Sequence, residues 1–167
     1  YDRIDDAGRP DPSLRPNQLF AVSLPHSPLS PEQAEGVVAA VERSLLVPLG
    51  VRTLAPEDPA YRGQYLGGRR ERDAAYHQGT AWPWLLGPFA AAYLRVHGHR
   101  ATARERLREL LVPLAAHMRE FGLGQVAEVV SGDPPHVPGG CFAQAWSVAE
   151  AIRVVGIVAG HGAGPDE

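Results

Sequence analysis

Residues 76–84 read Tyr-His-Gln-Gly-Thr-Ala-Trp-Pro-Trp and combine polar groups with flat aromatic rings. Tyr76, His77 and Gln78 can all donate and accept hydrogen bonds, and Trp82 adds an indole close by. Sugars need this mixture, because their hydroxyls require polar partners and their apolar faces stack on aromatic rings. The segment therefore indicates a carbohydrate site. The alternative is a helix N-terminus whose tryptophans are core anchors.

A Gly-rich loop at residues 122–128 carries one carboxylate, Glu128, among small apolar side chains. Desolvation in such surroundings favours the protonated carboxyl, a property that acid–base catalysis often uses. Glu128 is therefore a candidate catalytic group. The alternative is a glutamate that simply faces solvent.

Residues 140–147, Gly-Cys-Phe-Ala-Gln-Ala-Trp-Ser, form a third candidate segment. Gln144 can hydrogen-bond a ligand, and Trp146 can stack on one. The alternative is a buried helix that packs Phe142 and Trp146. We expect Cys141 to be a small buried hydrophobe, because nothing local argues for an activated thiol.

Metal and nucleotide motifs are absent from the sequence. The seven histidines are scattered and form no HExxH pattern, and one cysteine cannot build a Cys-based zinc site. There is no GxGxxG and no Walker loop. We therefore expect neither a metal nor a cofactor.

The composition is that of one soluble globular domain: 167 residues, 44% hydrophobic and 21% charged. No apolar run reaches the roughly 20 residues of a membrane span, and no signal peptide is visible, so a cytoplasmic protein is expected. The net charge of -3 gives no basic excess for nucleic acid. All 16 basic Lys+Arg residues are arginine, which indicates codon bias from a GC-rich, bacterial genome.

Helical spacing and end signals predict an all-α fold of about five helices. The expected helices cover residues 19–24, from 31 to just before Pro48, from near Thr80 to 97, from Thr102 to 121, and about 141–158. Capping boxes are expected at Ser30 with Gln33 and at Thr102 with Glu105, and Pro113 should kink or break its helix. The last helix should pack one face on the core, namely Phe142, Ala145, Trp146, Ala149 and Ile152.

Two stretches, residues 51–79 and 122–140, show no good helical pattern. Loops of this length in a compact domain are usually functional or disordered, and their aromatic, polar, Gly and Pro content favours function. Each leads into a helix whose first turns carry tryptophan. This pattern predicts that aromatic and polar groups gather at one end of a helical scaffold.

At these residues the sequence resembles glycogen debranching enzymes of the amylo-α-1,6-glucosidase type. The similarity covers residues 13–25, with Arg-Pro-Asn-Gln at 15–18, then residues 53–56, 61–63, 76–84 and 140–150, in the family's order. It extends to about residue 155. The combination of YHQGTxWPW with GCxAQAWSVAE is specific.

The resemblance implies an (α/α)6 toroid of six inner and six outer helices. It implies hydrolysis of α-1,6-linked glucose at glycogen or limit-dextrin branch points with inversion. Because five helices cannot close such a ring, it also implies that residues 1–158 are the C-terminal part of the domain. Residues 159–167 are then expected to be a flexible tail, and the chain's start without Met agrees with an upstream part.

The resemblance also assigns residues. Related toroid glycosidases, such as glucoamylases and trehalases, carry the general base in a Gly-x-x-x-Glu loop before a late helix, and Glu128 matches that position. The family's acid is an aspartate in the earlier half, so Asp2, Asp5 and Asp6 are not candidates. The expected sugar-binding residues are Tyr76, His77, Gln78, Trp82, Gln144 and Trp146, with supporting roles for Arg15, Asn17 and Gln18.

Two other functions stay open at this stage. The first is a glucoamylase-like or trehalase-like glycosidase of the same fold. The second is a non-catalytic glycan-binding or structural helical domain. For the debranching interpretation, the expected partners are an α-glucan and the N-terminal part of the same toroid, while nucleic acid and membrane are not expected.

Overall fold

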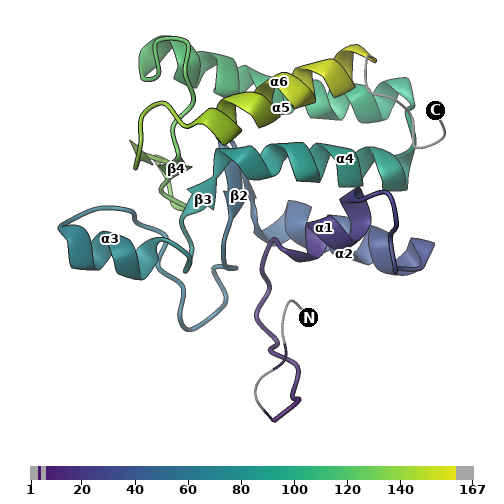
Figure 1. Ribbon diagram of the computed structural model, residues 1–167, viewed down its shortest axis with the longest axis horizontal. Coiled ribbons are helices and arrows are strands. Elements are labelled where there is room, and N and C mark those ends of the chain that lie inside the picture. The colour runs from purple at the N-terminus through teal and green to yellow at the C-terminus, as the bar shows by residue number, and fades with distance from the viewer. Residues whose placement is uncertain (1–3, 5–6, 161–167) are drawn as a thin grey trace.

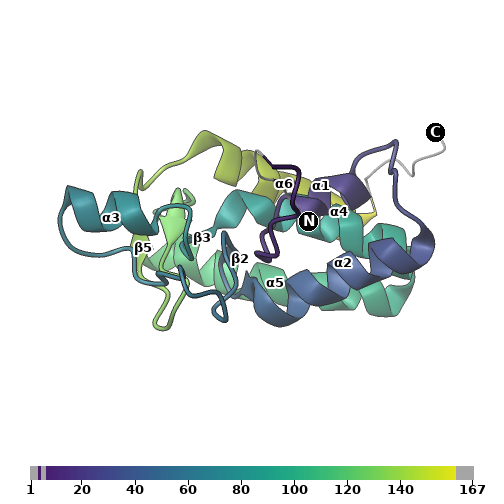
Figure 2. The same cartoon turned by 90° about the horizontal axis from the view of Figure 1, so that it is seen from below.

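Five helices pack against one another in two layers. The computed structural model describes residue 4 and residues 7–160. The helices are α1 (Gln18–Ser23), α2 (Pro31–Ser44), α4 (Leu86–His97), α5 (Ala101–Glu120) and α6 (Ala145–Ala159). Figure 1 shows α4 between α1 and α6, and Figure 2 shows α2 and α5 behind that layer. The front helices run in one direction and the back helices in the other. The helix-rich fold is as predicted.

The core lies between these layers. It contains Leu19 of α1, Val38 of α2, Phe89 of α4, Leu107 of α5 and Val154 of α6, each at most 1% exposed. The first four predicted helices supply four of these five side chains. Burial of an apolar stripe is what stabilises helices of this length.

A small antiparallel sheet lies at one end of the helices (Figure 1), and the sequence pattern did not predict it. Its strands follow in sequence order: β1 (Leu46–Val47), β2 (Gly50–Arg52), β3 (Ala81–Trp82), β4 (Val129–Val130) and β5 (Pro138–Gly139). Strands of two or three residues are too short to show an alternating pattern. The sheet joins the two long loops to the start of α4, since Val51 pairs with Trp82 and Ala81 with Val130.

The first long loop also contains regular structure that the sequence pattern did not predict. It contains the helix α3 (Arg69–Ala75), which the absence of a helical pattern had argued against. Only Ala75 of α3 is buried, so no apolar stripe announces this helix. The expected helix start near Thr80 was likewise wrong, because β3 and a 3-10 turn, η1 (Pro83–Leu85), precede α4.

The two predicted capping boxes have different outcomes. Ser30 accepts the Gln33 N–H and the Gln33 side chain accepts the Ser30 N–H, which confirms the first. The second was wrong: α5 begins at Ala101, so Thr102 lies inside the helix and cannot cap it. The Glu105 carboxylate instead pairs with Arg108, 2.6 Å away.

Pro113 does not break its helix, because α5 continues through it to Glu120. Proline removes one backbone hydrogen bond and costs about 3 kcal/mol inside a helix. Leu107, Leu110 and Leu114 on both sides of Pro113 are buried in or beside the core. We attribute the unbroken helix to this burial, since each buried leucine contributes about 2 kcal/mol.

The last helix differs most from its prediction. It begins at Ala145 rather than Cys141, and it buries Ser147, Val154 and Val158. The predicted core face points outward, with Phe142 63%, Trp146 48% and Ile152 67% exposed. Ala145 and Ala149 are exposed as well. The helix is apolar on both sides, so its spacing alone does not decide which side is inside.

The expected tail lies largely outside the described residues, which end at residue 160. Ala159 closes α6 and Gly160 caps it with a φ of +85°, while residues 161–167 are not described. Among the described residues, no helix is long and apolar enough to cross a lipid bilayer.

Candidate active site

Glu128 lies at the centre of the candidate site, just before β4, and its side chain is half-buried. The Tyr76 hydroxyl donates a hydrogen bond to Oε1 at 2.5 Å. The Cys141 N–H donates to Oε2 at 2.9 Å. Two donors aimed at the two oxygens fix the plane of the carboxylate. Glu128 is therefore neither a free surface glutamate nor fully buried.

The Tyr76 that binds this carboxylate belongs to an aromatic cluster of seven rings: Phe20, Tyr65, Tyr76, His77, Trp82, Trp84 and Trp146. The Tyr76 ring lies 4.8 Å from both His77 and Trp82 and 5.8 Å from Tyr65. Trp146 stacks on Trp84 at 5.3 Å and meets Trp82 edge-on at 5.9 Å. Stacked and edge-on ring pairs of this kind contribute about 0.5–1.5 kcal/mol each beyond the area they bury.

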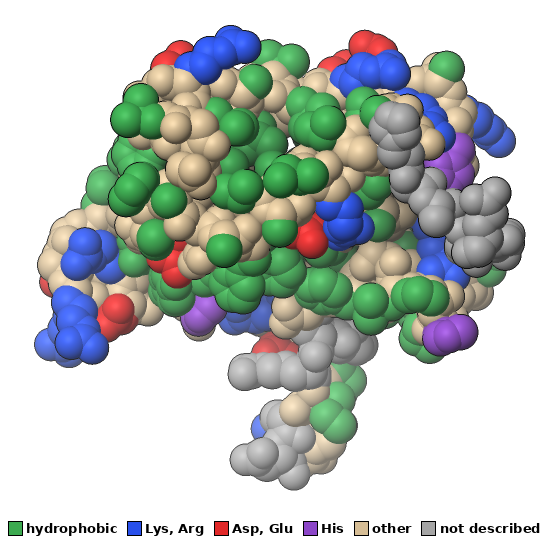
Figure 3. All heavy atoms as spheres, turned by 45° about the horizontal axis from the view of Figure 1, so that its top comes forward, with side chains coloured by type: hydrophobic (Ala, Val, Ile, Leu, Met, Phe, Trp, Pro, Cys, Tyr) green, Lys and Arg blue, Asp and Glu red, His purple; other side chains and the backbone are tan. Residues whose placement is uncertain are grey.

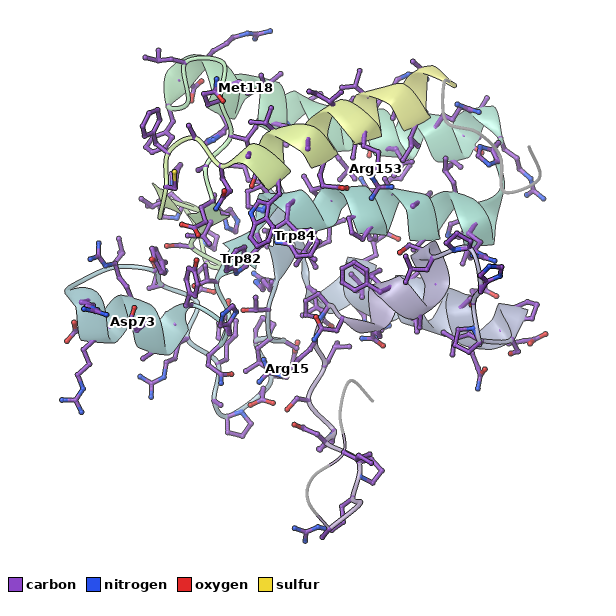
Figure 4. All side chains as sticks on the ribbon, in the orientation of Figure 1. Arg15, Asp73, Trp82, Trp84, Met118 and Arg153 are labelled. Carbon is purple, nitrogen blue, oxygen red and sulfur yellow. The ribbon has the colours of Figure 1, made fainter. Side chains whose placement is uncertain are left out.

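The cluster forms where the N-terminal ends of the three front helices meet. Phe20 comes from α1, Trp82 and Trp84 precede α4, and Trp146 lies in the first turn of α6. Figure 4 shows both tryptophans at the start of α4, with Arg15 on the segment that leads into α1. The expected gathering of aromatic and polar groups at one end of the scaffold is therefore what the structure shows.

Arg15 ties the start of α1 to the Tyr76 segment. Its guanidinium donates to the carbonyl oxygens of Thr53 at 3.1 Å and His77 at 2.8 Å, and to Gln78 Oε1 at 2.9 Å. Gln18 in turn donates to the Arg15 carbonyl at 2.9 Å. These two residues hold the segment in place, and the Gln78 amide oxygen is already engaged by Arg15.

The remaining predicted residues occupy distinct positions. Trp82 is only 6% exposed and donates its indole N–H to the Tyr76 carbonyl, so it anchors the core as the alternative interpretation held. The exposed His77 ring stacks parallel to it at 5.6 Å. Gln144 precedes α6, and its N–H donates to the Val126 carbonyl. Asn17 is exposed and makes no capping bond for α1.

Trp146 and Cys141 correct two sequence-based expectations. The alternative of a helix that buries Phe142 and Trp146 was wrong, since both side chains are largely exposed. Cys141 is exposed rather than a buried hydrophobe. Its contact with Glu128 is made by its backbone N–H, which residue type could not reveal.

The comparison with known proteins now decides the family. Residues 1–153 match the family described as amylo-alpha-1,6-glucosidase. The chain belongs to this family. It is also similar to the glycogen debranching enzyme of Saccharomyces cerevisiae (strain ATCC 204508 / S288c), at 35% identity over 105 residues. That match covers 58% of this chain and 7% of the yeast protein, so the chain spans a small part of its curated relative.

In this member of the amylo-alpha-1,6-glucosidase family, Tyr65 and Tyr76 are neighbours of Glu128. The sequence predicted a site role for Tyr76 but not for Tyr65. The tyrosines of the first loop stood out as a group, but only the fold places Tyr65 next to Tyr76. Burial raises the pKa of Tyr65, and the nearby Glu128 charge adds to the effect. Burial and the Glu128 hydrogen bond also raise the pKa of Tyr76 well above its usual value, so its hydroxyl stays a donor at neutral pH.

A second carboxylate of this family member, Asp133, has a different environment. It accepts a hydrogen bond from the Tyr61 hydroxyl at 2.7 Å and packs directly against Gly63. Burial and this bond raise the pKa of Tyr61 to about 12. Asp133 therefore ties the two long loops together. Asp2, Asp5 and Asp6 lie outside the described residues.

The described part of the chain contains no cluster of three or more His, Cys, Asp or Glu side chains that could hold a metal ion. The polar groups at the site are the hydrogen-bonded Glu128 carboxylate, the Tyr76 hydroxyl and the Cys141 N–H. These can bind hydroxyls and move a proton.

Proposed function

We propose that this chain provides the general base and part of the sugar site of a cytoplasmic, inverting α-1,6-glucosidase that acts at glycogen branch points. The observation that carries the proposal is the Glu128 carboxylate, held by Tyr76 and Cys141 beside the aromatic cluster. Membership of the amylo-alpha-1,6-glucosidase family supports this reaction and an α-glucan substrate.

In an inverting reaction two carboxyl groups act from opposite faces of the sugar ring, about 6.5–9.5 Å apart. Glu128 takes a proton from a water molecule as that water attacks the anomeric carbon. The general acid donates a proton to the leaving glycosidic oxygen. A bond forms between C1 and the water oxygen as the bond between C1 and the glycosidic oxygen breaks. We place the acid in another part of the ring, outside the described residues.

The contacts of Glu128 suit a base. The Tyr76 hydroxyl and the Cys141 N–H each occupy one lone pair of a different oxygen, which leaves further acceptor sites for water. Because both donors are fixed by their own contacts, the carboxylate need not reorganise during the proton transfer. Trp146, half-exposed at the rim of the cluster, is positioned to stack on a glucose ring.

We propose that the two helix layers are five consecutive helices of an (α/α)6 ring. In chain order the helices alternate between the front layer (α1, α4, α6) and the back layer (α2, α5), as inner and outer helices of a toroid do. Figure 3 shows hydrophobic side chains gathered over the outer side of α6. The exposed Phe142, Ile152 and Val155 contribute to that side. A neighbouring part of the ring would cover them.

The decisive experiment replaces Glu128 in the complete protein that carries this domain. Glu128→Gln keeps the size and the acceptor oxygen but removes the base, so kcat on limit dextrin should fall by about 100- to 10,000-fold. Binding of maltooligosaccharide should persist. Glu105→Gln, which alters an exposed ion pair on α5, is the matched control and should leave kcat unchanged. Near-normal turnover by Glu128→Gln would exclude it as the base.

Substrate preference distinguishes the debranching activity from the glucoamylase-like and trehalase-like activities. Branched limit dextrin, maltose and trehalose should be offered to the same enzyme, and we expect a preference for the branched substrate. A preference for trehalose or maltose would replace the debranching assignment with a trehalase-like or glucoamylase-like one. Binding without hydrolysis of all three would leave a glycan-binding domain.

A further inference from the structure

His117 is a buried polar side chain that the proposed reaction does not use. It lies in the last turn of α5 and is 5% exposed. Its carbonyl accepts the N–H groups of Phe121 at 2.9 Å and Gly122 at 3.0 Å, and its ring stacks on Phe121 at 5.4 Å. The imidazole is therefore fixed at the point where α5 ends and the Glu128 loop begins.

The ring of His117 holds the loop through one hydrogen bond. Its Nε2 accepts the N–H of Ala127 at 3.1 Å. Because a backbone N–H can only donate, Nε2 must be the unprotonated nitrogen of a neutral ring. Ala127 is fully buried, so without His117 its N–H would need another partner. Burial of the ring lowers the pKa of His117 and thus favours the neutral form this bond requires.

This bond acts on the residue next to the candidate base. Two successive backbone N–H groups are held here: that of Ala127 by His117, and that of Glu128 by the Cys141 carbonyl at 2.8 Å. Leu123 and Gly124, with φ of +47° and +90°, turn the chain between α5 and this point. A loop that turns so sharply needs such anchors to hold one register.

We propose that His117 is a positioning residue for Glu128, acting through the Ala127 N–H. The inference rests on the proposed function, because it assumes that the placement of Glu128 limits the rate. Loss of the bond lets the loop relax, so the carboxylate leaves its reactive position more often. Small displacements of a catalytic group can lower kcat by about 100-fold.

Three variants of the complete protein test this. His117→Leu removes the acceptor and should lower kcat about 10- to 100-fold with KM changed less than about threefold. His117→Gln places Oε1 the same number of bonds from Cα as Nε2, so it should restore most of kcat. Leu114→Ala opens a cavity in the same helix but keeps the bond; it should lower Tm while retaining kcat.

Amide hydrogen exchange of Ala127 gives a readout that does not depend on catalysis. Exchange should become at least about tenfold faster in His117→Leu, and stay slow in His117→Gln and Leu114→Ala. Unchanged exchange of Ala127 in His117→Leu would overturn the inference. Faster exchange with an unchanged kcat in that variant would overturn it too. So would equal losses of kcat in His117→Gln and His117→Leu. Failure of the base assignment shows separately, as retained activity in Glu128→Gln.

Discussion

Gly140 lies directly against the carboxylate of Glu128, with a backbone φ of +69°. A Cβ added at residue 140 would overlap with Glu128 Oε2. The same turn brings the Cys141 N–H onto that oxygen. The close approach and the positive φ both require glycine here, so the position of the Glu128 carboxylate depends on the absence of a side chain at residue 140.

Gly140→Ala should therefore damage both stability and activity. The left-handed backbone costs a non-glycine residue about 1–2 kcal/mol. The displaced carboxylate should lower kcat by about 100-fold. Gly98→Ala is the matched control, because Gly98 has a φ of +71° but open space around it. Chemical denaturation should show that both variants are destabilised, and Gly140→Ala more so because of the overlap with Glu128. Kinetics should show a loss of kcat in Gly140→Ala alone; equal kcat in the two variants would contradict the close contact.

Tyr76→Phe keeps the ring in the aromatic cluster and removes the hydroxyl that binds Glu128. We expect kcat to fall about 10- to 100-fold with little change in KM, since hydrogen bonds to charged groups contribute about 1.5–3 kcal/mol. The control is Tyr93→Phe on α4, whose ring packs on His97 away from the site. Initial rates over a substrate series would measure both constants. A parallel rise in KM would show that Tyr76 serves binding instead.

The stability of the domain should fall in mild acid because of His117. Its folded-state pKa lies below the ordinary value of 6.5, since burial disfavours the charged ring. The unfolded chain therefore binds the proton more readily, and this contribution is complete above about pH 6.5 and lost as the pH falls through the folded pKa. His117→Gln should flatten this part of the curve of unfolding free energy against pH. The exposed His26, changed to Gln, should leave the slope intact.

The outer side of α6 should behave differently in the isolated 167-residue chain and in the complete protein. Ile152 is 67% exposed, so Ile152→Ser should cost little stability in the isolated chain and reduce its binding of a hydrophobic dye. If the rest of the ring covers this side, the same change should lower the Tm of the complete protein. Val154→Ser, at a fully buried neighbour, should destabilise both forms. An equal effect of Ile152→Ser on the two forms would argue against ring closure over α6.

Local signals predicted much of the scaffold. The Ser30–Gln33 capping box depends on four consecutive residues, and it is present as expected. Gly98 ends α4 with a positive φ, a backbone conformation that glycine adopts without strain. The second capping box failed because α5 begins one residue before Thr102. Helix ends of this kind shift by a residue or two when tertiary contacts favour another start.

The site was predictable as a set of residues and not as an arrangement. Residue types and the family resemblance placed Tyr76, Trp146 and Glu128 among the candidates. That the Tyr76 hydroxyl meets Glu128, 52 residues away, depends on the pairing of β3 with β4. His117 gave no signal beyond being one histidine among seven, because its role comes from a single contact with a backbone N–H.

The sequence by itself determined the helical scaffold and the chemistry available to it, because periodicity, caps and residue types act over a few neighbouring positions. Three features depend on the tertiary structure alone: the small sheet, the position of the Glu128 carboxylate and the choice of which face of α6 points outward. The two-residue strand β3 forms only because β2 and β4, both distant in the sequence, supply its hydrogen bonds. A helix that is apolar on both sides takes its orientation from whichever surface packs against it.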